Sequence, residues 1–118
     1  MDATARPVTA VERAIQAQTR AIARLIGLLK HRAAAVQVDA ADALRALAPP
    51  PVWDLIGALI KARDTRFRVE IIRVLGGLGG EYRSHITLAL AQLWQGGDPA
   101  IRQAIVEAVL ILGPASLD

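Results

Sequence analysis

Apolar side chains recur every three or four residues along most of this chain, the spacing that lines one buried face of a helix. Alternation with a period of two, which is typical of strands, is absent. Helix start and stop signals divide the pattern: a Thr9-x-x-Glu12 capping box opens it, and Pro49-Pro50-Pro51 and the glycine-rich segment 76–80 interrupt it. The pattern predicts six helices, at about residues 9–31, 34–47, 52–62, 65–75, 82–95 and 99–112.

The second helix of each predicted pair repeats in sequence. Two segments align with their apolar positions in register, residues 64–79 and residues 98–113. Asp64 matches Asp98, and each stands where an N-cap residue accepts backbone N–H bonds. Arg68 matches Arg102 one turn later. Each Arg is therefore expected to pair with the cap carboxylate or with a neighbouring repeat.

A third copy of the same pattern begins at Ala33. It keeps the apolar register but has Ala33 at the Asp position and Gln37 at the Arg position. The preceding helices align as well, in the triplets Leu25, Ile56 and Leu90; Leu28, Leu59 and Leu93; and Leu29, Ile60 and Trp94. Each unit therefore consists of two helices joined by a short turn.

The shared pattern, D-x-x-Φ-R-x-x-Φ-Φ-x-x-Φ-x-x-L-G with Φ apolar, resembles the second helix of a HEAT repeat over about residues 20–114. The resemblance implies an all-α fold, an α-solenoid (α-α superhelix) of about three stacked antiparallel helix pairs. It also implies structural roles for Asp64, Asp98, Arg68 and Arg102. Because HEAT proteins serve many purposes, a function has to be argued from the residues.

Composition narrows the class of protein. The 118 residues are 53% hydrophobic but only 3% aromatic, and the absence of cysteine excludes disulfides and thiolate metal sites. No apolar run approaches the ~18 to 20 residues of a membrane span, and the first residues have no signal-peptide core. We expect a cytoplasmic protein with one repeat domain at residues 9–114, a flexible segment at 1–8 and a tail at 115–118.

Candidates for catalysis or metal binding are few. His31 and His85 fall in different repeats without further ligands at helical spacing, so no metal site is expected, and His31 is interpreted as a cation at a helix C-terminus. The glycine-rich segment 76–80 lacks the preceding strand and the Gly-Lys-Ser/Thr ending of a phosphate loop. Neither Ser84 nor Ser116 has the context of a nucleophile. The sequence thus predicts a protein that is not an enzyme and holds no cofactor.

Positive charge clusters in two parts of the chain, within a formal net charge of +3. Lys61, Arg63 and Arg66 lie around the turn between the third and fourth predicted helices. With the earlier basic residues they suggest a ridge suited to phosphate backbones or an acidic protein patch, although a solvated edge is the commoner outcome. The earlier residues are Arg20, Arg24, Lys30 and Arg32.

The two tryptophans and the last helix bear on interfaces. Trp94 shares a register with apolar core residues, so a core position is expected. Trp53 is expected to seal a turn, with an exposed partner anchor as the alternative. Apolar residues nearly encircle the last helix, and a terminal repeat needs a polar outer face to be soluble alone. Val106, Leu110 and Ile111 are therefore candidates for self-association into a homodimer, unless they pack sideways within the chain.

These observations favour a protein–protein interaction or scaffold module, with Trp53, Arg63, Arg66 and Arg73 as the first candidates for contact with a protein partner. A nucleic-acid-binding module is the second hypothesis. The chain resembles HEAT-like DNA glycosylases only in its repeats, because it shows no catalytic Asp with a flanking aromatic pocket. An accessory subunit or lyase-like HEAT protein is the third, although the chain lacks the Cys and His/aromatic groupings expected of a bilin lyase.

Overall fold

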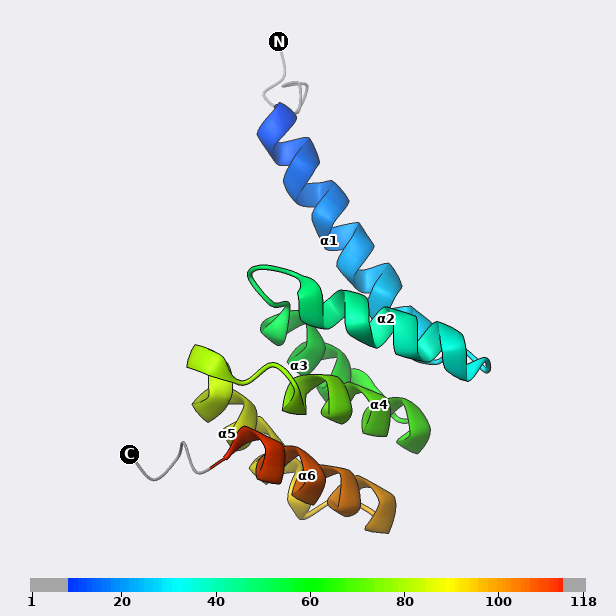
Figure 1. Ribbon diagram of the computed structural model, residues 1–118, viewed down its shortest axis with the longest axis vertical. Helices are drawn as coiled ribbons and strands as arrows, with labels where there is room; N and C mark the ends of the chain where they lie inside the picture. The colour runs from blue at the N-terminus through cyan, green and yellow to red at the C-terminus, as the bar shows by residue number, and fades with distance from the viewer. Residues whose placement is uncertain (1–8, 114–118) are drawn as a thin grey trace.

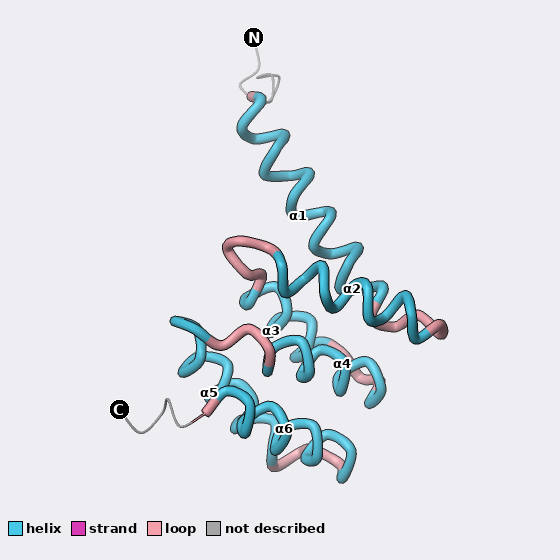
Figure 2. The backbone as a smooth tube through the Cα atoms, viewed as in Figure 1, coloured by secondary structure: helices cyan, strands magenta, loops and turns pink. Residues whose placement is uncertain are grey.

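The computed structural model describes residues 9–113, and within this range the chain is helical, with turns but no strand (Figures 1 and 2). The elements are α1 (Ala10–Leu28), α2 (Ala34–Ala46), α3 (Val52–Lys61), α4 (Thr65–Gly76), the 3-10 turn η2 (Gly80–Tyr82), α5 (Arg83–Trp94) and α6 (Pro99–Leu112). The prediction of an all-helical fold is confirmed. The segments 1–8 and 115–118 lie outside the described residues.

The helix bounds follow the predicted ones closely, and the largest difference is at the end of α1. This helix ends at Leu28, three residues before the predicted end. The next amides form single turns, with Lys30 N–H donating to Gly27 O and His31 N–H donating to Leu28 O, both over three residues. The glycine-rich segment ends α4 as predicted, and Gly79 and Gly80 adopt positive φ of 48° and 60°, which glycine tolerates best.

The helices form two rows. Helices α1, α3 and α5 make one row and α2, α4 and α6 the other, and each helix also packs on its partner in the pairs α1–α2, α3–α4 and α5–α6 (Figure 1). The core between the rows is aliphatic, and its largest fully buried side chains include Leu29, Leu44, Leu55, Ile71 and Leu90. Burying each such side chain contributes roughly 1.5–3 kcal/mol. The N-terminal half of α1 projects beyond this body (Figure 1).

Side-chain caps begin three of the helices. Asp64 accepts a hydrogen bond from Phe67 N–H over 3.1 Å, and Asp98 accepts one from Ile101 N–H over 2.9 Å. Thr9 caps α1 in the same way. Helix α2 begins at the Ala33 position without a side-chain cap, because the Asp of the other two copies is missing there.

One side chain in each pair ties the second helix to the end of the first. Arg68 Nε donates to Ala62 O over 2.7 Å, and Arg102 Nε donates to Trp94 O over 3.0 Å. Gln37 occupies the same repeat position, and its Nε2 donates to His31 O over 2.7 Å and to Leu29 O over 3.3 Å. We call Gln37, Arg68 and Arg102 the turn donors. They bind backbone carbonyls of their own pair, whereas the sequence led us to expect the two arginines on carboxylates or on a neighbouring repeat.

Helices α4 and α6 meet at an unusually short distance. A methyl group placed on Gly76 would lie 2.9 Å from Ala108 Cβ and 3.0 Å from Ala108 Cα. Atoms that close would overlap, and the second is a backbone atom that cannot rotate away. Glycine at position 76 and alanine at position 108 therefore set how closely the two helices approach.

Gly76→Ala is expected to destabilise the fold by about 1–3 kcal/mol, because the added methyl must push α4 and α6 apart. The matched control is Gly57→Ala in α3, where a methyl meets no atom within 4 Å. That change should stabilise the fold by roughly 0.5–1 kcal/mol, since alanine favours the helix. Urea unfolding of both variants measures the difference. Equal effects of the two substitutions would contradict the close approach.

Gln37→Leu is expected to lower the free energy of unfolding by about 1 kcal/mol, because two carbonyls lose a buried donor. Gln37→Arg should retain most of the stability, since arginine serves as the turn donor in the other two pairs. Chemical unfolding followed by circular dichroism makes the comparison. If Gln37→Arg is as unstable as Gln37→Leu, the three positions are not equivalent.

Candidate functional site

An apolar groove lies between the last two helices. Val106, Leu110 and Ile111 of α6 are 44%, 77% and 71% exposed. The groove has a volume of about 470 Å³, and none of the side chains that line it is charged. They are Thr87, Ala91, Trp94, Gln95, Ile105, Val106, Val109 and Leu110. We call this groove, with the neighbouring Ile111, the α5/α6 end face.

The repeat explains why these α6 residues are apolar. Ile105, Val106, Val109 and Leu110 align with Ile71, Ile72, Leu75 and Gly76 of α4, all of which are buried. Helix α6 packs against α4, whereas no helix among residues 9–113 lies on the equivalent surface of α6. Val106 and Leu110 therefore occupy positions that are buried in α4 but remain exposed within the described chain. A helix packed on this surface could not approach α6 as closely as α6 approaches α4, because Leu110 stands in place of Gly76.

Trp94 lies at the rim of this end face, and the expectation of a core position is wrong. Its side chain is 40% exposed, and the Arg102 guanidinium stacks 5.2 Å from its ring centroid. Of its repeat equivalents, Leu29 is buried but Ile60 is 65% exposed. Residues that share this repeat position therefore differ in how far they are buried. The position falls next to the last residue of α3 and at the last residue of α5.

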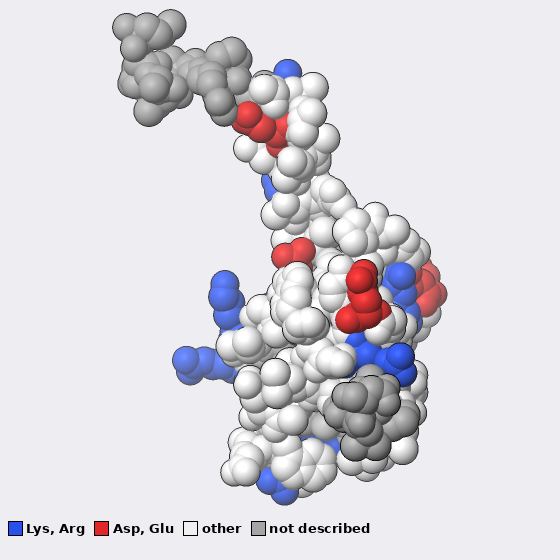
Figure 3. All heavy atoms as spheres, turned by 90° about the vertical axis from the view of Figure 1, so that its left-hand side faces the viewer, with Lys and Arg blue, Asp and Glu red and all other residues white. Residues whose placement is uncertain are grey.

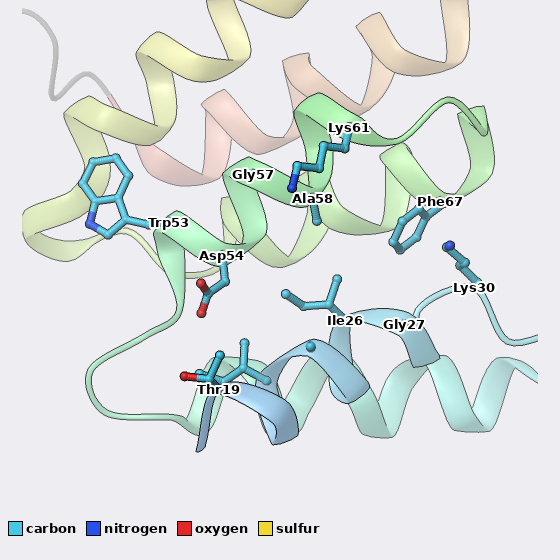
Figure 4. A pocket seen from close by; sticks show the side chains of 12 residues that line it. Thr19, Ile26, Gly27, Lys30, Trp53, Asp54, Gly57, Ala58, Lys61 and Phe67 are labelled. Atoms are coloured by element: carbon cyan, nitrogen blue, oxygen red, sulfur yellow. The ribbon is translucent and has the colours of Figure 1, made fainter. Parts of the chain in front are cut away.

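A second groove, also of about 470 Å³, runs between α1 and α3 (Figure 4). Trp53 lines it and is 59% exposed, so the expectation that it seals a turn is wrong. The edge of its ring meets His85 of α5 at 5.1 Å between centroids. Lys30 also lines the groove, with its Nζ 4.6 Å from the centre of the Phe67 ring. We call it the α1/α3 groove.

The basic residues spread over more than one surface. Lys and Arg side chains project from the body in Figure 3, and Lys30 and Lys61 share the α1/α3 groove. Arg63 and Arg66 are exposed near the following turn. Arg73 lines grooves among α2, α4 and α6 instead, and pairs with Glu70 over 3.0 Å. Trp53 and Arg73, both predicted partner contacts, therefore lie on different grooves. Of the predicted basic ridge, Arg20, Arg24 and Arg32 are exposed but do not line the α1/α3 groove.

The histidines belong to local packing. His31 Nδ1 accepts a hydrogen bond from Ala33 N–H over 3.0 Å, which ties this side chain to the turn between α1 and α2. His85 contacts Trp53. Among residues 9–113 no three His, Asp or Glu side chains gather as metal ligands would. Within that same range no helix combines the length and the apolar character needed to span a membrane.

Comparison of the chain with protein-family models, with curated proteins and with solved structures gave no match.

Asp98 joins the last helix pair to the one before it. Besides capping α6, its carboxylate accepts a hydrogen bond from the Thr65 hydroxyl of α4 over 2.9 Å. The bond from Ile101 N–H, and then the one from Thr65, hold the pKa of Asp98 below its ordinary value of 3.8. Asp98 in its ionised form therefore stabilises the contact that positions the end face.

The pH dependence of stability follows from this shift. Because the pKa of Asp98 is lower in the folded than in the unfolded chain, its contribution is present above pH ~4 and is lost as the pH falls through the folded pKa. Asp98→Asn, which keeps an oxygen for Ile101 N–H, should flatten the decline of unfolding free energy below pH ~4. Thr65→Val should flatten it partly. Thermal unfolding between pH 7 and pH 2 tests this, and an unchanged slope in Asp98→Asn would refute it.

Proposed function

We propose that this chain is a non-catalytic protein–protein interaction module, a HEAT-like α-solenoid of about three stacked helix pairs that self-associates through its last pair. The observation that carries the proposal is the open α5/α6 end face. Its exposed residues Val106 and Leu110 align with Ile72 and Gly76 of α4, which are buried, and Gly76 is covered by Ala108 of α6.

Three features support the solenoid arrangement. The same repeat position supplies the turn donor in every pair. Helices of one row contact the next helix of that row, from α1 to α3 to α5 and from α2 to α4 to α6. The hydrogen bond from Thr65 to Asp98 links equivalent ends of neighbouring pairs. Such repeats bury their apolar faces by stacking, so an open face invites another unit.

A second copy of the chain suits this face. A two-fold interface brings a surface against itself, so like charges on it would repel each other. The groove of the end face is lined without charge, and the protruding Leu110 stands at its edge. The same face thus offers both a projection and a hollow. Contiguous exposed apolar surface of this kind marks interaction sites in soluble proteins.

Light scattering behind a sizing column, over a dilution series, tests self-association. The chain should elute as a dimer that dissociates on dilution. The double substitution Val106→Glu and Leu110→Glu should raise the dissociation constant of the dimer at least about a hundredfold, because the interface would bury unpaired carboxylates from both copies. The control is Val11→Glu, on the projecting half of α1, which should leave the dimer intact.

Two results would reject the proposal. One is a monomeric mass for the unsubstituted chain at every concentration. The other is a dimer that survives the double substitution on α6 with unchanged affinity.

A further inference from the structure

We infer that the α1/α3 groove binds a helical segment of a protein partner, with the acidic C-terminal end of that segment placed against Lys30 and Lys61. This surface is distinct from the α5/α6 end face. The inference therefore holds whether or not two copies of the chain associate.

Two glycines line the groove, Gly57 in the middle of α3 and Gly27 in the last turn of α1. Glycine destabilises a helix relative to alanine, so a reason for it is expected. Gly76 has one, since Ala108 touches it. A methyl on Gly27 or Gly57 meets no atom within 4 Å. Packing within the described chain does not require these glycines, but they leave the groove floor open to the close approach of another backbone.

The groove is long and has a mostly apolar lining. Ile22, Ile26 and Ala58 give it apolar walls, and the exposed Trp53 stands beside it as an anchor. Along α1 the lining runs from Thr19 to Gly27, which is roughly 12 Å or two helical turns at 1.5 Å per residue, and Lys30 extends it into the turn that follows. An apolar groove of this length between two helices suits the apolar face of a short helix.

The charged residues that α3 contributes to the groove lie at opposite ends of this helix, with Asp54 in its first turn and Lys61 in its last. The Asp54 carboxylate lies on the side of Thr19 (Figure 4). Lys30 lies in the turn that follows α1, and Lys61 is the last residue of α3. A helix has a partly positive N-terminus and a partly negative C-terminus. A segment that lies parallel to α1 and α3 would place its N-terminus near Asp54 and its C-terminus near the two lysines. Acidic residues in its last turn would strengthen this match.

The same polarity disfavours two other occupants. A nucleic-acid strand along the groove would bring phosphates against Asp54. The exposed apolar part of α1 from a second copy, with Val11 and Ile15, is followed by Arg20 and Arg24. If this part of α1 bound parallel to the groove, its two arginines would lie near Lys30 and Lys61, and the like charges would repel each other. A partner segment with an acidic C-terminal end meets neither conflict.

Binding of a synthetic probe tests the inference. The probe is an alanine-rich peptide of about 14 residues with leucines at helical spacing and glutamates in its last turn, and its matched counterpart carries lysines there. Trp53 fluorescence reports binding in a Trp94→Phe chain, which leaves Trp53 as the single tryptophan. The acidic peptide should bind at least about tenfold more tightly than the basic one. Lys61→Glu should remove this preference, whereas the control Arg13→Glu on the projecting half of α1 should keep it.

Variants of Gly57 separate binding from folding. Gly57→Leu should abolish peptide binding by filling the groove, with the helical circular dichroism retained. Gly57→Ala should raise Tm by about 4 °C and weaken binding several-fold, a combination that a purely structural glycine would not give. The inference is overturned if neither peptide shifts the Trp53 emission at about 1 mM, or if both peptides bind equally. It is also overturned if Gly57→Leu binds as well as the parent, or if a single-stranded oligonucleotide displaces the acidic peptide.

Discussion

The architecture depends on how each helix pair is closed at its turn. The last carbonyls of a helix have no partner within the helix and must be bonded by other groups. In this chain the turn donor of the following helix bonds them, as Gln37 does for the segment after α1 and Arg102 for the end of α5. A donor anchored one turn into the second helix fixes the angle at which that helix returns. The apolar faces of the two helices then meet, and the aliphatic core forms between the two rows.

Stacking of such pairs has a consequence for the surface. The residues of a pair that face the next pair along the chain are buried only when that next pair lies on them. Helix α6 covers α4 in this way where Ala108 lies against Gly76. The last described pair also has apolar residues at these positions, and two of them, Val106 and Leu110, are exposed. The α1/α3 groove is open for another reason. It lies between two helices of one row, and two of its lining residues are glycines without a side chain to fill it. The two surfaces therefore differ in chemistry. The groove between α5 and α6 has no charged lining residue, with Arg102 at its rim, whereas the α1/α3 groove is lined by a carboxylate and two lysines.

Much of the fold could be predicted because its signals are local. The N-caps Asp64 and Asp98, the proline and glycine interruptions and the helical spacing of apolar residues depend on near neighbours in sequence. The sequence also contained a signal that was missed. Gln37 stands in the register of the two arginines and has a donor group, yet the absence of charge made the position look like a loss of the motif.

Burial at the ends of the helices was harder to predict, since it depends on which other helix covers a residue. Trp94 shares a register with the buried Leu29, but α5 has no following helix on that side within residues 9–113. For Trp53 the sequence left a sealed turn and an exposed anchor as alternatives, and it did not show that this residue borders a groove formed with α1. Sequence spacing shows which residues share a helix face and does not show what lies against that face. For α6 the sequence left two outcomes open, an interface with another copy or sideways packing within the chain. Leu110 and Ile111 are exposed, so these two do not pack sideways within residues 9–113.

The central claim is that the open face of α6 is covered by a second copy of the chain in solution. Hydrogen–deuterium exchange measured at low and at high protein concentration tests it most directly, because it locates the protected amides as well as detecting association. The account predicts that amides of residues 105–111 exchange more slowly at high concentration, while those of α2 are unchanged. Exchange in α6 that is independent of concentration would contradict the account.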